Sequence, residues 1–140
     1  MKPRIITGGK HQDERGTLTF NNAFDASEVK RFYTISNTNI TFERGWQGHA
    51  VEQRWFSAIM GTFEIKLVKI DHWQNPSKTL QSERFIITSQ QCDVLHVPAG
   101  YVSCIRATEP NSKLLVMADY RLGEIQDEYR FPLDYFKNNV

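Results

Sequence analysis

The chain consists of short segments rich in β-branched and aromatic residues, separated by turn-forming residues such as Asn75-Pro76-Ser77 and Pro98-Ala99-Gly100. This pattern predicts strands joined by tight connections. The expected strands are Arg4–Thr7, Thr17–Phe20, Arg31–Ser36, Gln53–Met60, Thr62–Asp71, Arg84–Thr88, Asp93–Val97, Tyr101–Ala107 and Lys113–Tyr120.

Alternation is clearest in Thr62–Asp71, where Phe63, Ile65 and Leu67 alternate with polar residues. Because successive side chains of a strand point to opposite faces, this segment predicts a sheet with one buried and one wet face. Gly61 separates two strong strand segments and predicts a tight hairpin between them. Many short strands with little helical signal indicate an all-β sandwich or barrel.

Length and composition favour one globular domain, residues 1–140, with 40% hydrophobic residues and a net charge of +1. That charge gives no electrostatic reason to expect a nucleic acid or a membrane as partner. The N-terminus has no apolar signal segment, and no apolar run approaches the roughly 20 residues that span a bilayer. The two cysteines, Cys92 and Cys104, are expected to be reduced thiols. We therefore expect a cytoplasmic protein.

The segment Arg44–Gln53 carries the most chemistry. If it is extended, Gln47 and His49 project from the same face because they lie two residues apart. A neutral imidazole can remove a proton near pH 7, and Arg44 can bind a phosphate or a developing oxyanion. Spacing alone leaves the simpler alternatives open, namely a structural His49 and a surface Arg44.

The same segment, Arg44-Gly45-Trp46-Gln47-Gly48-His49, resembles the RGxHxH signature of cupin-type sugar 3,4-ketoisomerases and the RGxHxQ segment of dTDP-4-keto-sugar 3,5-epimerases, the WxcM-like group. Matches elsewhere support the resemblance. They are Asp13–Leu18 with a D-x-R-G-x-L opening, Arg31-Phe32-Tyr33 with an Arg-x-Tyr strand, Val97–Tyr101 with an IPxGF turn, Ala118-Asp119-Tyr120 with a DY pair, and Arg130–Phe136 with an epimerase-type tail.

The resemblance implies a cupin fold (double-stranded β-helix, or jelly-roll barrel) and a dTDP-4-keto-6-deoxyhexose as substrate. The reaction would move the keto group from C4 to C3 through an enediol, in the synthesis of surface-polysaccharide sugars. No cofactor is needed for this reaction. The resemblance also implies a homodimer, and the strand-like N-terminal segments are compatible with strand exchange.

Several residues acquire expected roles from this resemblance. His49 matches the second ketoisomerase histidine and is the expected base and proton shuttle. Gln47 can hydrogen-bond the sugar or orient His49. Tyr33 and Tyr120 match tyrosines on inward-facing strands of the family and are candidates to carry a proton or bind the sugar. Packing at the barrel mouth is an equal alternative for both.

Three further residues are candidates for substrate binding. Arg44 matches the family arginine for oxyanion or diphosphate contact. Trp46 is a candidate for stacking on thymine or on the sugar, with core packing as the alternative. Glu52 is a candidate for substrate binding.

Gln47 marks a departure from both families. It replaces the first ketoisomerase histidine, and the epimerases carry their base at the same position. The chain is therefore expected to be a nucleotide-sugar 3,4-ketoisomerase. The alternatives are a 3,5-epimerase-like enzyme with altered base placement and a cupin that binds a nucleotide sugar without chemistry. Metal binding is not expected, because beyond His49 and Glu52 the sequence offers no clustered ligands.

Overall fold

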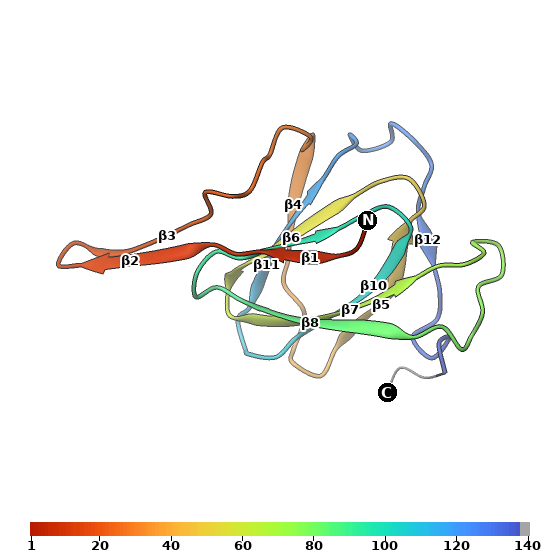
Figure 1. The fold of residues 1–140 in the computed structure, drawn as a ribbon. Helices are drawn as coiled ribbons and strands as arrows, with labels where there is room; N and C mark the ends of the chain where they lie inside the picture. The colour runs from red at the N-terminus through yellow and green to blue at the C-terminus, as the bar shows by residue number, and fades with distance from the viewer. Residues whose placement is uncertain (138–140) are drawn as a thin grey trace.

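Residues 1–137, which the computed structural model describes, form two five-stranded antiparallel sheets and a separate hairpin (Figure 1). Sheet one has the order β1 (Arg4–Ile6), β9 (Val94–Val97), β6 (Arg54–Met60), β11 (Lys113–Ala118) and β4 (Arg31–Ile35). Sheet two has the order β12 (Tyr129–Arg130), β5 (Glu43–His49), β10 (Tyr101–Ala107), β7 (Thr62–Lys69) and β8 (Ser82–Thr88). The described residues contain no helix, so none there could span a membrane. The predicted all-β, cupin-like architecture is confirmed.

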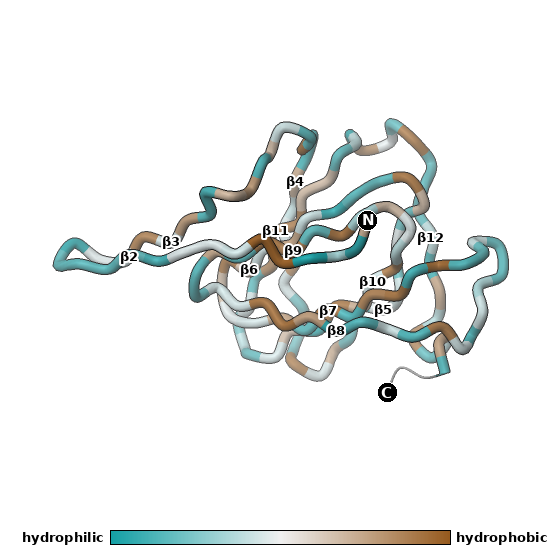
Figure 2. Tube along the Cα trace, in the orientation of Figure 1, coloured by the Kyte–Doolittle hydropathy of each residue, from teal (hydrophilic) through white to brown (hydrophobic). Residues whose placement is uncertain are grey.

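The main core lies between the two sheets. Phe63, Ile65 and Leu67 of β7 face Phe56 of β6 and Val116 of β11, and each of these side chains is almost fully buried. Burying a side chain of this size contributes about 1.5–3 kcal/mol to stability. Figure 2 shows hydrophobic segments along strands of both sheets, for example in β7 and β9. The alternation read from the sequence therefore identifies the inward face of β7.

The chain passes from one sheet to the other at Gly61. The residue has a positive φ of 72°, a conformation that favours glycine. However, β6 pairs with β9 and β11, whereas β7 pairs with β8 and β10. The expected hairpin at Gly61 is therefore wrong, because the turn forms a corner between sheets. A glycine between two strand segments predicts a tight turn whether that turn closes a hairpin or joins two sheets.

The outer face of sheet two is covered instead of wet. Val68 on this face is fully buried and packs in a second cluster with Trp46 and Phe136. The C-terminal segment supplies the cover, since Phe131 and Tyr135 also pack against this cluster. The expectation of a wet face is corrected because distant residues, which strand periodicity does not encode, occupy it.

The N-terminal hairpin of β2 (Gly9–Asp13) and β3 (Gly16–Phe20) projects away from the barrel (Figure 1). Its side chains are mostly exposed, and Leu18 keeps 61% of its surface accessible. The sequence missed β2 because its residues are polar and follow a Gly-Gly pair. An isolated two-stranded hairpin is at best marginally stable in water, so this element needs further contacts.

Candidate active site

Two adjoining cavities lie at one end of the barrel and share His49, Glu52 and Arg54 in their walls. The first extends between the sheets and is also lined by Tyr33 of β4. The second lies under the 121–129 segment and is the larger, about 1060 Å³ including open solvent against about 530 Å³. The three shared residues therefore lie at the junction of the two cavities, where they would contact a ligand that occupies both.

β5 positions His49 at its last residue. In the register with β10, Ser103 is opposite Gln47 and Tyr101 is opposite His49. Gln47 and His49 therefore share one face of β5, as the spacing predicts, and both line the first cavity. Gly48 between them allows the strands to approach closely, because a Cβ atom there would collide with the backbone of Tyr101. This close pairing fixes where the imidazole lies.

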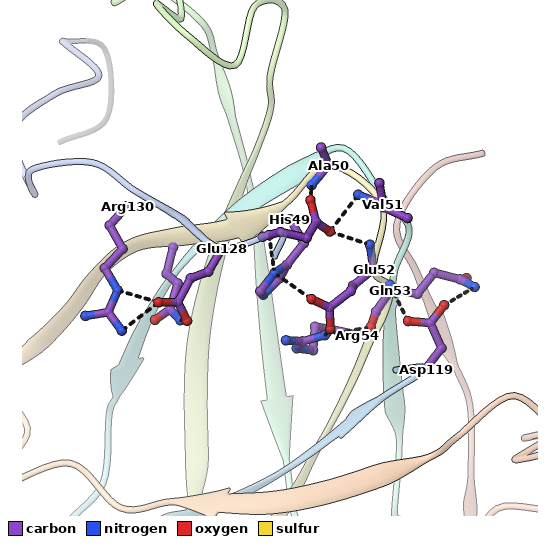
Figure 3. Close-up of polar contacts among 11 residues, drawn as sticks. His49, Ala50, Val51, Glu52, Gln53, Arg54, Asp119, Glu128 and Arg130 are labelled. Atoms are coloured by element: carbon purple, nitrogen blue, oxygen red, sulfur yellow. Dashed lines mark hydrogen bonds and ion pairs between the residues drawn. The ribbon is translucent and has the colours of Figure 1, made fainter. Parts of the chain in front are cut away.

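Asp127 holds His49 and the turn that follows it, whose residues are labelled in Figure 3. The carboxylate accepts hydrogen bonds from the backbone N–H groups of Ala50, Val51 and Glu52, at 2.8–2.9 Å. The backbone carbonyl of Asp127 lies 2.8 Å from His49 Nδ1. A carbonyl can only accept, so Nδ1 carries the proton and Nε2 is left as the basic nitrogen.

The environment keeps His49 neutral. Burial lowers the pKa of its imidazole, and the positive charge of Arg54 lowers it further. The Asp127 carbonyl and the Glu52 carboxylate act in the opposite direction but do not reverse the shift. Because the pKa lies below its usual value of about 6.5, the ring is an unprotonated base at neutral pH.

Glu52 and Arg54 form a buried ion pair beside this ring. Glu52 Oε1 lies 3.0 Å from Arg54 Nη1, and Glu52 Oε2 lies 3.5 Å from His49 Nδ1. Both side chains are at most 10% exposed. Glu52 therefore links the base to a buried cation, and both residues border the two cavities.

Gln47 is held by the segment that contains β12. Its Nε2 donates to Glu128 Oε1 at 2.6 Å, and Arg130 in turn binds Glu128. This bond fixes the orientation of the amide, because only the NH₂ group can donate to a carboxylate. Gln47 therefore has a defined hydrogen-bonding position but no group that titrates.

Two other expected residues also line the first cavity. Tyr33 projects from the inner face of β4, and the guanidinium of Arg31 lies 4.9 Å from its ring centroid. Arg44 borders the same cavity but is exposed. Arg31 also lines the second cavity, and its Nε is buried without a hydrogen-bond partner in the described structure.

Trp46 and Tyr120 are not brought to these cavities. Trp46 lies on the opposite face of β5, 2% exposed, with its ring against Phe136 and its indole N–H donating to the carbonyl of Leu133. Tyr120 follows β11 and is outside both cavity linings, with Lys30 above its ring. Trp46 therefore packs in the core, which was the alternative to stacking on thymine or on the sugar.

A potential metal-ligand set exists on distance alone, since atoms of His49, Glu52 and Asp127 lie within 4.8 Å of one another. Their bonding does not fit a cation. The Asp127 carboxylate already accepts three N–H groups, His49 Nδ1 donates to a carbonyl, and Glu52 is paired with Arg54. We therefore derive no chemical step through a metal.

Sequence reasoning missed Asp127, Arg54 and Tyr101. Tyr101 directly follows the Pro98–Gly100 turn, which is part of the family resemblance, so the sequence did offer a signal for this residue. Burial raises the pKa of its hydroxyl. Asp127 lies in a polar segment far from His49 in the chain, and no local pattern predicts their contact. Arg54 begins a strand whose inward face could be predicted only from its alternation with Phe56.

Comparison with known proteins matches the chain to one family model. A family model described as FdtA, WxcM-like, C-terminal, matches residues 1–139. No curated protein matches significantly.

Solved structures of similar fold include two ketoisomerases and one epimerase. A mutant of the 3,4-ketoisomerase QdtA from Thermoanaerobacterium thermosaccharolyticum, in complex with TDP-4-keto-6-deoxyglucose, is 17% identical with a TM-score of 0.72, covering 96% of this chain and 91% of that chain. A 3,4-ketoisomerase from Helicobacter canadensis is 22% identical with a TM-score of 0.69, covering 98% and 96%. The rmlC epimerase of Mycobacterium tuberculosis is 17% identical with a TM-score of 0.75, covering 94% and 70%.

Proposed function

Because this chain belongs to the WxcM-like, C-terminal family of FdtA, we propose that it is an isomerase of a nucleotide-linked 4-keto-6-deoxy sugar. The observation that carries the proposal is the state of His49: it is buried at the junction of two cavities, with Nδ1 bound to Asp127 and Nε2 left basic. The ligand named for the QdtA structure, TDP-4-keto-6-deoxyglucose, supplies the substrate class.

In the proposed reaction, His49 Nε2 removes the proton from C3 of the sugar. The electron pair of that C–H bond forms the C3–C4 double bond, and the C4 carbonyl oxygen gains the negative charge. Transfer of the C3 hydroxyl proton to this oxygen gives the enolate of the 3-keto sugar. The protonated His49 then returns its proton to C4, which balances the reaction without a redox cofactor.

Tyr33 is our candidate for moving the proton between the two oxygens, since it lines the cavity with His49. Gln47 is a hydrogen-bonding partner of the sugar. The diphosphate is assigned to Arg44 and Arg31, which border the first and second cavity respectively. The positive charge of Arg31 in the wall of the second cavity supports an anionic ligand there.

We further propose that the active form is a homodimer in which the β2–β3 hairpin contacts the second copy. The hairpin's exposure and its distance from the barrel support this. The sugar product would serve surface-polysaccharide synthesis in the cytoplasm, and neighbouring genes for aminotransferases and glycosyltransferases would support that role.

The test is isotope exchange. The protein is incubated with dTDP-4-keto-6-deoxyglucose in deuterated water, and the sugar positions C3, C4 and C5 are followed by NMR. We expect deuterium at C3 and C4 and formation of a 3-keto product, both lost in His49→Asn. The variant should still bind dTDP, measured by calorimetry, since the nucleotide is assigned to other residues.

Two other outcomes would contradict ketoisomerisation. Exchange at C3 and C5 would indicate an epimerase-type reaction. Tight binding without exchange would indicate a binding module, the function that the non-titrating Gln47 favours.

A further inference from the structure

Arg54 is a buried cation to which the reaction above gives no role. It lies on the inward face of β6 with Phe56, is 7% exposed and borders both cavities. Within residues 1–137, its hydrogen bonds to Glu52 and to the carbonyl of Gln53 use Nη1. A guanidinium has five N–H donors, so Nε and Nη2 are available for a ligand.

The position of Arg54 suits a charge that develops beside His49. Glu52 joins the two residues through the Nδ1 edge of the imidazole, at 3.0 Å from Arg54 Nη1 and 3.5 Å from His49 Nδ1. The relation of Arg54 to the basic Nε2 rests on the cavity walls, because Arg54 and His49 line both cavities together. Arg44, which the family match assigns to the oxyanion or to the diphosphate, is exposed. Fixed donors stabilise charge far better in a site that excludes water than at an exposed position, where solvent screens them.

We propose that Arg54, and not Arg44, donates a hydrogen bond to the C4 oxygen as it becomes negative. This assignment rests on the proposed function. When His49 Nε2 takes the C3 proton, the C–H electron pair forms the C3–C4 double bond and the carbonyl oxygen gains the negative charge. The Arg54 N–H groups donate hydrogen bonds to this oxygen. The proton later returns from His49 to C4, so Arg54 itself gains and loses no proton.

Arg54 has a second effect that the experiment must separate. Its charge opposes protonation of His49, and its pairing neutralises Glu52. The variant Arg54→Met leaves the Glu52 carboxylate buried and unpaired beside the imidazole, which favours a protonated ring. The double variant Glu52→Gln/Arg54→Met removes both charges of the pair, so it also avoids a buried unpaired carboxylate that would threaten folding.

The experiment measures kcat and KM for C3 exchange on dTDP-4-keto-6-deoxyglucose from mildly acidic to mildly alkaline pH. We expect kcat to fall about 10²–10³-fold in both variants at every pH, the usual effect of losing one oxyanion donor. Binding of dTDP should change little. Arg44→Met should instead raise KM, since Arg44 is assigned to the diphosphate.

Three results would overturn the assignment. Recovery of kcat in Arg54→Met at high pH, or in the double variant, would mean that Arg54 only controls the charge of His49. A large loss of kcat in Arg44→Met would return the oxyanion to Arg44. A wild-type protein that binds the sugar nucleotide without exchange would overturn the proposed function itself, and the role of Arg54 with it.

Discussion

At the residue scale, the site depends on the contacts of one imidazole. His49 could be predicted from its family match, and its shared face with Gln47 from the two-residue spacing. Its protonation state could not, because that state depends on Asp127, which lies 78 residues away in the chain. Burial and Arg54 then lower the pKa of the ring. The chemistry of His49 is therefore a product of contacts between distant segments.

The lowered pKa of His49 predicts that stability falls in mild acid. The unfolded chain binds this proton near the usual pKa of about 6.5, whereas the folded protein resists it until a lower pH. Between those values the unfolded state binds more protons, so the free energy of unfolding decreases as pH falls. Urea unfolding at a series of pH values should show this decrease, and it should be shallower in His49→Asn.

His11→Asn is the matched control, because the His11 side chain is 63% exposed on the hairpin. It should leave the acid-dependent decrease unchanged. Equal decreases in wild type and His49→Asn would mean that His49 is not the group responsible. Some decrease should persist in His49→Asn, since burial also lowers the pKa of His96.

At the element scale, β5 carries the site and is held on two sides. β10 pairs with it over most of its length, and the short β12 pairs with it at Gln47 and Gly48. The segment leading into β12 brings Asp127 and Glu128 to the same end of the strand. Figure 3 shows these contacts gathered around His49. β12 therefore helps to position the site although it contains only two residues.

Gly48→Ala is expected to disturb this element, because the new methyl group would collide with Tyr101 and Val102 of β10. Overpacking of this kind costs about 1–3 kcal/mol of stability. Displacing His49 by even 1 Å should lower the exchange rate by about 10²-fold. Urea unfolding and the C3 exchange rate measure the two effects.

Gly45→Ala on the same strand provides the comparison. A Cβ atom there would meet only Leu133, at 4.0 Å, an ordinary van der Waals contact. This variant should retain the folding free energy and the exchange rate. Equal losses in both variants would mean that glycine is needed for strand flexibility and not for close pairing.

At the scale of the whole molecule, residues 1–137 present two features that a second copy could cover. The β2–β3 hairpin extends into solvent, and β4 forms one edge of sheet one with Phe32 71% exposed. Unpaired edges and marginal hairpins are normally covered in folded proteins. Both features support the proposed homodimer, which would bury the hairpin.

Leu18→Glu is expected to weaken that dimer, since it places a charge on the apolar residue that the hairpin exposes most. Light scattering should give the wild-type protein twice the 16.3 kDa mass of one chain and shift the variant toward the monomer. Thr19→Glu, on the other face of β3, should shift it less. A monomeric wild type would contradict the proposal.

The sequence by itself determined the all-β class, the inward face of β7 and most of the strands, although β2, β5 and β12 were not among the expected ones. Alternation with a period of two is a local property of the chain. The sequence also placed His49 and Gln47 side by side. Only the tertiary structure decided that Gly61 turns a corner between sheets, that Trp46 lies under the C-terminal segment, and that Asp127 and Arg54 meet His49. Such contacts join residues from separate strands and loops, and their geometry depends on how the two sheets pack, which no local pattern records.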